Sequence, residues 1–201
     1  MRSTIFILAV LFTTVGFFSC SGKKDLTTIG YIQIAQDPSL DYGKNGFLKA
    51  LKDSGYVDGE NIKILDNNAQ GDLSMIPTII QNFISQNVDI IVTNGTPCMM
   101  SASQLVKEIP VVFTVAFSPV DMGISPVPDN LYGTYDPYDV KTFANLIVSL
   151  KPGLKKIGLP YNNTERNAEY SARKLIKEVR SRGIEVVTSS VTSPNDIQTA
   201  G

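Results

Sequence analysis

The stretch that decides the fold is VDIIVTNGTPCMMSASQLVKEIPVVFTV, which spans residues 88–115. It begins with an apolar run over residues 88–92 and ends with a second over residues 110–115, both rich in residues that favour β-strands. Between them, Thr96 and Pro97 are a typical helix start, an N-cap residue followed by proline at the first helical position. The stretch therefore predicts a strand–helix–strand unit.

The same alternation continues on both sides of this unit. Further strands are expected at residues 28–34, 61–65 and 131–135, with one helix ending at Ser54 before Gly55 and another around residues 76–84. Residues 36–41 and 66–72 are expected to form loops. Strands with near-continuous apolar runs are covered on both faces, so the sequence predicts an α/β fold with a doubly wound parallel sheet.

After the turn residues 136–138 the pattern restarts. Asp139 is a candidate cap for a helix that ends near Leu150, and a strand, a helix, a strand and a helix start follow at residues 156–159, 165–182, 184–189 and 193–196. We expect an N-terminal α/β lobe over residues 28–137, then a hinge helix and a partial second lobe over residues 138–201. In that second lobe Ile157, Leu159, Val186 and Val187 should stay partly exposed. Two explanations remain open: the second lobe is completed elsewhere, or the open reading frame is truncated.

The N-terminus has the features of an export signal. Arg2 precedes a run without charges over residues 5–18, which is shorter than the ~20 apolar residues that cross a bilayer. Ser19-Cys20 then resembles a bacterial lipobox, with Phe17 where leucine is usual. We expect residues 1–19 to be a signal peptide and residues 20–27 a lipidated N-terminus and tether, attached through Cys20 in the cell envelope. A plain signal peptide or an uncleaved anchor is the alternative.

Composition excludes several other classes of protein. The chain has 201 residues, of which 43% are hydrophobic and 18% charged, with a formal net charge of -1, which is typical of a globular protein. It has no basic block, which argues against nucleic acid as a partner. The sequence has no histidine, so a His-based catalytic triad or His-ligated metal is excluded. Without a glycine-rich dinucleotide fingerprint or a P-loop, we expect no enzyme, no metal and no cofactor.

Several short stretches, taken in order, resemble one family. They lie at residues 30–33, 38–41, 46–51, 55–61, 68–72, 109–114, 118–120, 155–158 and 195–197. Together they are similar to the substrate-binding lipoproteins of ABC transporters, whose better-known members take aromatic amino acids. The resemblance covers residues 27–201 and implies a type I periplasmic-binding-protein fold, with two Rossmann-like lobes and a hinge. Residues 98–100 and 122–130 depart from the family pattern.

Candidate ligand-binding residues follow the strands, because ligands of open α/β sheets bind beyond the carboxyl ends of the strands. Asp37 or Asp41 could pair with an ammonium group, or could serve only in a turn or cap. Thr96 lies at a helix start that suits a carboxylate, or it only caps that helix. Phe117 could stack on an aromatic ligand or pack in the core. The predicted set is Ser39, Asp41, Asn68, Gln70, Asn94, Thr96, Phe117 and Ser118, with Tyr161 and Asn162 added from the second lobe by the resemblance.

The resemblance implies that the protein captures a small molecule for an ABC importer. The ligand is expected to be an amino acid, with aromatic ones favoured, held between two lobes. Expected partners are the permease and ATPase subunits and, through the N-terminal lipid, the outer face of the cytoplasmic membrane or another membrane of the envelope. The alternative is a sensory or interaction lipoprotein, or a non-functional fragment of a binding protein.

Overall fold

The computed structural model describes residues 26–192 and 194–198. The expected signal peptide, residues 1–19, and the lipidation site Cys20 lie outside the described residues, so both stay predictions. Within the described ranges, no helix combines the length and the apolar character needed to cross a bilayer.

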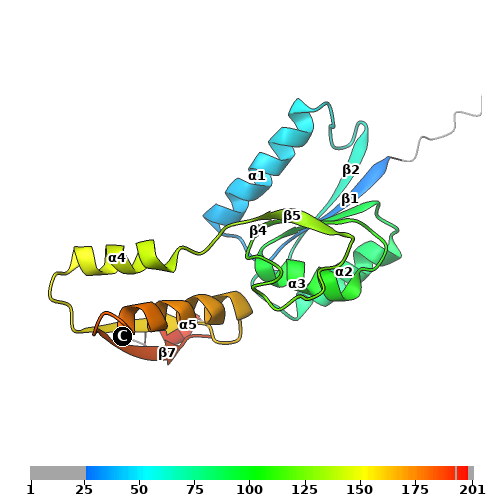
Figure 1. Ribbon diagram of the computed structural model, residues 1–201. Helices are drawn as coiled ribbons and strands as arrows, with labels where there is room; N and C mark the ends of the chain where they lie inside the picture. Colours follow the sequence, from blue (N-terminus) through cyan, green and yellow to red (C-terminus); the bar gives the residue numbers. More distant parts are fainter. Residues whose placement is uncertain (1–25, 193, 199–201) are drawn as a thin grey trace, which may run out of the picture.

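The first unit is a five-stranded sheet with three helices (Figure 1). Its elements are β1 (Thr27–Gln33), α1 (Pro38–Asp53), β2 (Ile62–Asn68), α2 (Met75–Ser85), β3 (Ile90–Asn94), α3 (Thr96–Leu105), β4 (Val111–Ala116) and β5 (Leu131–Tyr135). The strand order is β2-β1-β3-β4-β5, and all neighbouring strands are parallel. This arrangement confirms the doubly wound α/β sheet expected from the sequence.

Helices cover both faces of this sheet, with α1 on one side and α2 and α3 on the other (Figure 1). Side chains alternate along β1, so Tyr31 packs toward Phe47 of α1, whereas Ile32 packs into the core formed with α2 and α3. Phe83 and Met99 fill that second core and are fully buried. Burial on both faces explains why the three central strands, β1, β3 and β4, are rich in apolar residues.

The second unit contains α4 (Val140–Leu150), β6 (Lys156–Tyr161), α5 (Arg166–Arg180), β7 (Glu185–Ser190) and the short α6 (Pro194–Ile197). β6 and β7 form a parallel pair, α5 packs over it around Leu175 and Val179, and α4 packs against α5. Val187 is 46% exposed and Ile157 and Leu159 are half-buried, as expected, but Val186 is only 5% exposed. The expectation for Val186 was wrong because its side chain points into the core that α5 covers.

Several element boundaries differ from those expected. The loop predicted over residues 36–41 ends early, because Asp37 caps α1 and Pro38 occupies its first turn. β2 continues to Asn68 because its parallel pairing with β1 runs as far as the pair Gln33–Asn68. The N-cap of α3 is Gly95, and Thr96 is already the first helical residue. α5 also spans residues 166–180, which is shorter than the expected 165–182.

Candidate functional site

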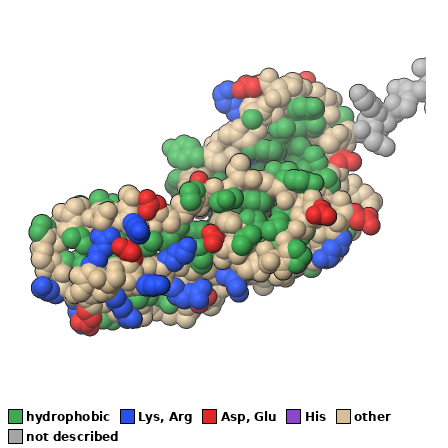
Figure 2. Space-filling model, viewed as in Figure 1, with side chains coloured by type: hydrophobic (Ala, Val, Ile, Leu, Met, Phe, Trp, Pro, Cys, Tyr) green, Lys and Arg blue, Asp and Glu red, His purple; other side chains and the backbone are tan. Residues whose placement is uncertain are grey.

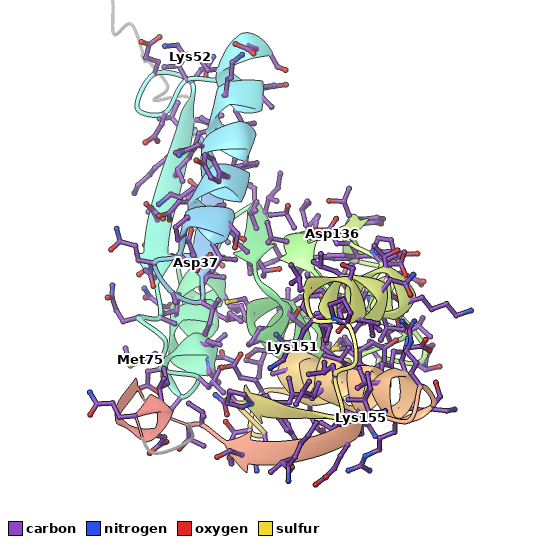
Figure 3. The ribbon with its side chains drawn as sticks, turned by 90° about the vertical axis from the view of Figure 1, so that its left-hand side faces the viewer. Asp37, Lys52, Met75, Asp136, Lys151 and Lys155 are labelled. Atoms are coloured by element: carbon purple, nitrogen blue, oxygen red, sulfur yellow. The ribbon has the colours of Figure 1, made fainter. Side chains whose placement is uncertain are left out.

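A cavity of about 590 Å³ lies at the carboxyl ends of β1, β3 and β4 and is closed on one side by the second unit. Its lining comes from the start of α1, the start of α3, the end of β4, the segment after β5, and the start of α5. Figure 3 labels two of the acidic lining residues, Asp37 before α1 and Asp136 after β5. The lining residues are Ile34, Asp37, Ser39, Leu40, Gly95, Thr96, Pro97, Val115, Ala116, Phe117, Asp136, Pro137, Tyr138, Glu165 and Asn167.

The first wall is the start of α1. The Asp37 carboxylate accepts hydrogen bonds from the backbone N–H and the hydroxyl of Ser39. These hydrogen bonds, the one from the Ser39 hydroxyl first, lower the pKa of Asp37 below its usual value. The carboxylate therefore stays ionised at neutral pH and places a negative charge at the edge of the cavity.

The second wall is the start of α3. Gly95 has φ +107°, and a Cβ there would lie 2.8 Å from the Ile34 Cγ2, so this position admits only glycine without a shift. Thr96 is 4% exposed, and its Oγ1 accepts a 3.0 Å hydrogen bond from the backbone N–H of Phe117. The first turn of a helix leaves backbone N–H groups unpaired and carries a partial positive charge. This wall therefore suits the negative end of a ligand.

A buried polar network supports these walls from below. Asn94 Nδ2 donates to the Tyr31 hydroxyl at 2.7 Å and to the Leu40 carbonyl at 2.8 Å, which ties the end of β3 to β1 and to α1. Burial raises the pKa of Tyr31 to about 12, so its hydroxyl stays protonated. Gln33 Nε2 donates to Asp41 Oδ1 at 2.8 Å, so Asp41 is held within the structure beside this network.

The end of β4 has an unusual backbone. Val115 lies in the cavity lining with φ +49°, in the left-handed region that a β-branched residue rarely enters. The register between β4 and β5 shifts in the same place, between Phe113 and Ala116. Gly43 of α1 gives the valine room, because a Cβ there would lie 2.6 Å from Val115 Cγ2. Strain of this kind clusters at ligand sites.

The second unit contributes Glu165 and Asn167 to the lining. Glu165 Oε1 accepts a 2.8 Å hydrogen bond from Asn162 Nδ2, which fixes the carboxylate. Asn167 Oδ1 is buried and has no hydrogen-bond partner among the described residues. A buried acceptor without a partner is unusual in a native protein. The lining described above includes the carboxylates of Asp37, Asp136 and Glu165 but neither lysine nor arginine.

The structure brings three of the predicted residues together in the lining: Ser39, Thr96 and Phe117. Three others contact the network or lining from outside, namely Asp41, Asn94 and Asn162. The remaining four lie outside the lining: Asn68 accepts from the Gln70 N–H, Ser118 accepts from the Met122 N–H, and Tyr161 ends β6. Four lining residues were not predicted: Asp136 and Tyr138 lie where the chain passes between the two units, and Glu165 and Asn167 lie at the start of α5. Their signal was a position beside a turn or a helix start.

The described residues contain no group of three or more acidic or cysteine side chains placed to hold a metal ion. Cys98 is fully buried, and burial raises the pKa of its thiol to about 12, so it is not an activated nucleophile. What the cavity offers is instead charge, hydrogen-bonding groups and aromatic surface, which are the elements of a small-molecule binding site.

Residues 28–201 match the family described as ABC transporter substrate binding protein. A tyrosine-binding protein of Clostridioides difficile (strain R20291) is 34% identical over 182 residues, which cover 89% of this chain and 53% of that protein. The chain thus spans about half the length of this curated relative.

Two solved structures are also similar. A conserved domain protein from Vibrio cholerae has a TM-score of 0.81 and is 30% identical in sequence. An ABC domain from Streptococcus pneumonia, solved in complex with L-Trp, has a TM-score of 0.79 and is 26% identical. Each match covers 87% of this chain and 60% of the other. The structural neighbours have the type I periplasmic-binding-protein fold expected from the sequence. This chain belongs to the ABC transporter substrate-binding protein family.

Proposed function

We propose that this chain acts in an ABC importer and captures an amino acid, preferably an aromatic one, in the cavity between its two units. The observation that carries the proposal is the separation of charge in the lining. Carboxylates of Asp37, Asp136 and Glu165 border the cavity, and the N-terminus of α3 provides its electropositive wall. An α-amino acid has a positive ammonium group that matches the carboxylates and a negative carboxylate that matches the N-terminus of α3.

Each part of such a ligand has a partner in the lining. The ammonium group would pair with the carboxylates, and the carboxylate with the N–H groups at the start of α3 beside Thr96. Phe117 and Tyr138, whose ring centroids are 6.3 Å apart, provide aromatic surface for the side chain. The volume of about 590 Å³ is within the range of small-molecule sites.

The similar proteins support the same ligand class. One is called a tyrosine-binding protein, and another was solved in complex with L-Trp. We extend the proposal to the anchor: Cys20 becomes the lipidated N-terminus, which keeps the protein at the membrane surface near the permease and ATPase subunits. Substrate-binding proteins of ABC transporters work outside the cytoplasm, and this position is consistent with that role.

The ligand proposal is tested by titrating the chain with amino acids and following backbone amide resonances. L-Tyrosine, L-tryptophan and L-phenylalanine should shift the resonances of Gly95, Thr96 and Phe117. Tyramine, which lacks the carboxylate, should leave Gly95 and Thr96 unchanged and shift only the aromatic wall. A chain that is folded but shows no shift with any amino acid at millimolar concentration would contradict the proposal and favour a sensory role or a non-functional fragment.

The anchor proposal has a separate test. Metabolic labelling with a fatty-acid analogue should mark the wild-type protein and leave Cys20→Ser unlabelled. Equal labelling of the two proteins would show that the cysteine is not the attachment site.

A further inference from the structure

One side chain of the second unit packs into the core of the first. Tyr170 of α5 lies against the apolar cluster of the first unit, to which β1, β3, β4, α2 and α3 contribute. Among the described residues of the second unit, Tyr170 is the only one in this cluster. Its ring meets the Phe117 ring edge to face, with centroids 5.8 Å apart and an interplanar angle of 69°. The two units are therefore joined by a specific aromatic contact.

Phe117 stands between two tyrosines. Its ring also meets that of Tyr138, in the segment that joins the units, edge to face, with centroids 6.3 Å apart and an interplanar angle of 71°. Phe117 and Tyr138 line the cavity, whereas Tyr170 does not. The backbone N–H of Phe117 also donates to Thr96 Oγ1. A continuous set of contacts thus runs from α5 through Phe117 to the start of α3.

Two neighbours of Tyr170 on α5 extend this contact. Arg166, Tyr170 and Lys174 are spaced four residues apart, so they share one face of the helix. Lys174 Nζ lies 4.3 Å from the Tyr170 ring centroid and donates to its hydroxyl. The Arg166 guanidinium packs against Gly123 so closely that a Cβ there would lie 2.8 Å from its Nη2. The face of α5 defined by these three residues is therefore fitted to the loop that follows Phe117.

We infer that Tyr170 is a positioning residue, which fixes the angle between the two units and holds Phe117 in the wall of the ligand cavity. It acts through Phe117 and has no contact of its own with the cavity. The ring pair is one part of a junction that also includes Arg166 against Gly123 and contacts of α5 with α3. Its loss should therefore let the second unit shift relative to the first without unfolding either core. The angle between the units does not depend on a ligand, and only the effect of Tyr170 on binding rests on the proposed function.

The angle is measured without ligand by the distance between two spin labels. Lys52→Cys at the end of α1 and Lys155→Cys before β6 are exposed sites on different units (Figure 3). Cys20→Ser removes the other native cysteine, and Cys98 stays unlabelled because it is buried. Tyr170→Leu should shift the distance distribution and raise the population of the displaced arrangement about threefold to tenfold, the effect of one aromatic pair. Tyr170→Phe, which keeps the ring, should reproduce the wild-type distribution.

Binding is measured in a second arm with L-tyrosine. Tyr170→Leu should weaken affinity by the same factor, and Tyr170→Phe should restore it. If Tyr170→Leu does not fold, Phe117→Leu removes the same ring pair from the other unit and should give the same change in distance. An unchanged distance distribution in a folded variant overturns the inference. If the wild type binds no amino acid, the proposed function fails, while the distance arm still decides the role of Tyr170.

Discussion

The chain contains two strand–helix–strand segments of the same design and different surroundings. β1, α1 and β2 have 7, 16 and 7 residues, and β6, α5 and β7 have 6, 15 and 6. Both strand pairs are parallel. β1 pairs with β2 and β3 and is buried over its last five residues, whereas the described residues pair β6 with β7 alone, and its burial alternates. Tertiary neighbours, more than local sequence, decide how deeply a strand is buried.

The surfaces differ in the same way. In Figure 2, Lys and Arg side chains gather over the unit that contains α5, whereas apolar side chains gather over the larger unit. Val112, Tyr132 and Tyr135 of β4 and β5 belong to this exposed apolar set. On the second unit, α4 also leaves Phe143, Leu146 and Leu150 exposed. The larger unit thus has two buried cores and some exposed apolar side chains. The smaller unit is stabilised by the single core on one face of its strand pair.

The largest expected effect contrasts the protection of the two sheets. Amide protons of β1 and β3 should exchange at least about 100-fold more slowly than those of β6 and β7, because opening the first sheet exposes two cores and opening the second exposes one. Hydrogen exchange followed by mass spectrometry measures this ratio. Equal protection would mean that the two units unfold together and that their sheets do not differ in stability.

Core truncation sharpens the same contrast. Phe83→Ala should lower the free energy of unfolding by about 3–5 kcal/mol, because the ring is fully buried. Leu159→Ala on half-buried β6 should cost clearly less, on the order of 1 kcal/mol, since its side chain is only partly buried against the smaller core. Urea denaturation monitored by circular dichroism gives both values. A larger loss of unfolding free energy for Leu159→Ala than for Phe83→Ala would show that the second unit contributes more to stability than the first.

A smaller effect is expected at the junction of α3 and β4. Thr96→Val keeps the shape of the side chain but leaves the Phe117 N–H without its acceptor, which should cost about 1–2 kcal/mol. Thr96→Ser, the matched control, keeps the oxygen and should stay within about 0.5 kcal/mol of the wild type. Denaturant midpoints compare the two variants. Equal midpoints would show that water replaces the lost acceptor.

The smallest effect concerns the two aspartate caps, one in each unit. Asp37 caps α1 and Asp139 caps α4, and hydrogen bonds to Ser39 and to Thr142 lower the pKa of each carboxyl below its usual value. A lowered folded-state pKa stabilises the protein above the unfolded-state pKa, and this contribution disappears as pH falls through the folded-state pKa. Asp139→Asn should therefore flatten the acid side of the stability curve below about pH 4. An unchanged curve would show that the cap charge is fully screened.

Much of the fold could be predicted because the central strands β1, β3 and β4 are apolar runs and helix starts or glycines mark the ends of several elements. The start of α1 was missed because Asp37 and Pro38 are typical of turns as well as of helix caps. Thr96 and Phe117 could be predicted as lining residues because both directly follow strand ends. Asp136 and Asn167 could not, because Asp136 lies in the segment between the units and Asn167 reaches the cavity only through the packing of α5 against the first unit.

The backbone conformation of Val115 is a second feature that could not be predicted from the local sequence. A valine in an apolar run predicts an ordinary extended residue, but here it adopts φ +49° beside the register shift of β4 and β5. Nothing local favours that conformation. It exists because Gly43, far away in the chain, leaves space for the side chain.

The burial of Cys98 has a consequence for chemical durability. Substrate-binding proteins of ABC transporters work outside the cytoplasm, where thiols meet oxidants and form disulfides. Oxidation begins from the thiolate, and the thiol of Cys98 is both inaccessible and held protonated by a pKa of about 12. The cysteine therefore behaves as a small apolar side chain of the core, and it should survive an oxidising compartment without forming cross-linked dimers.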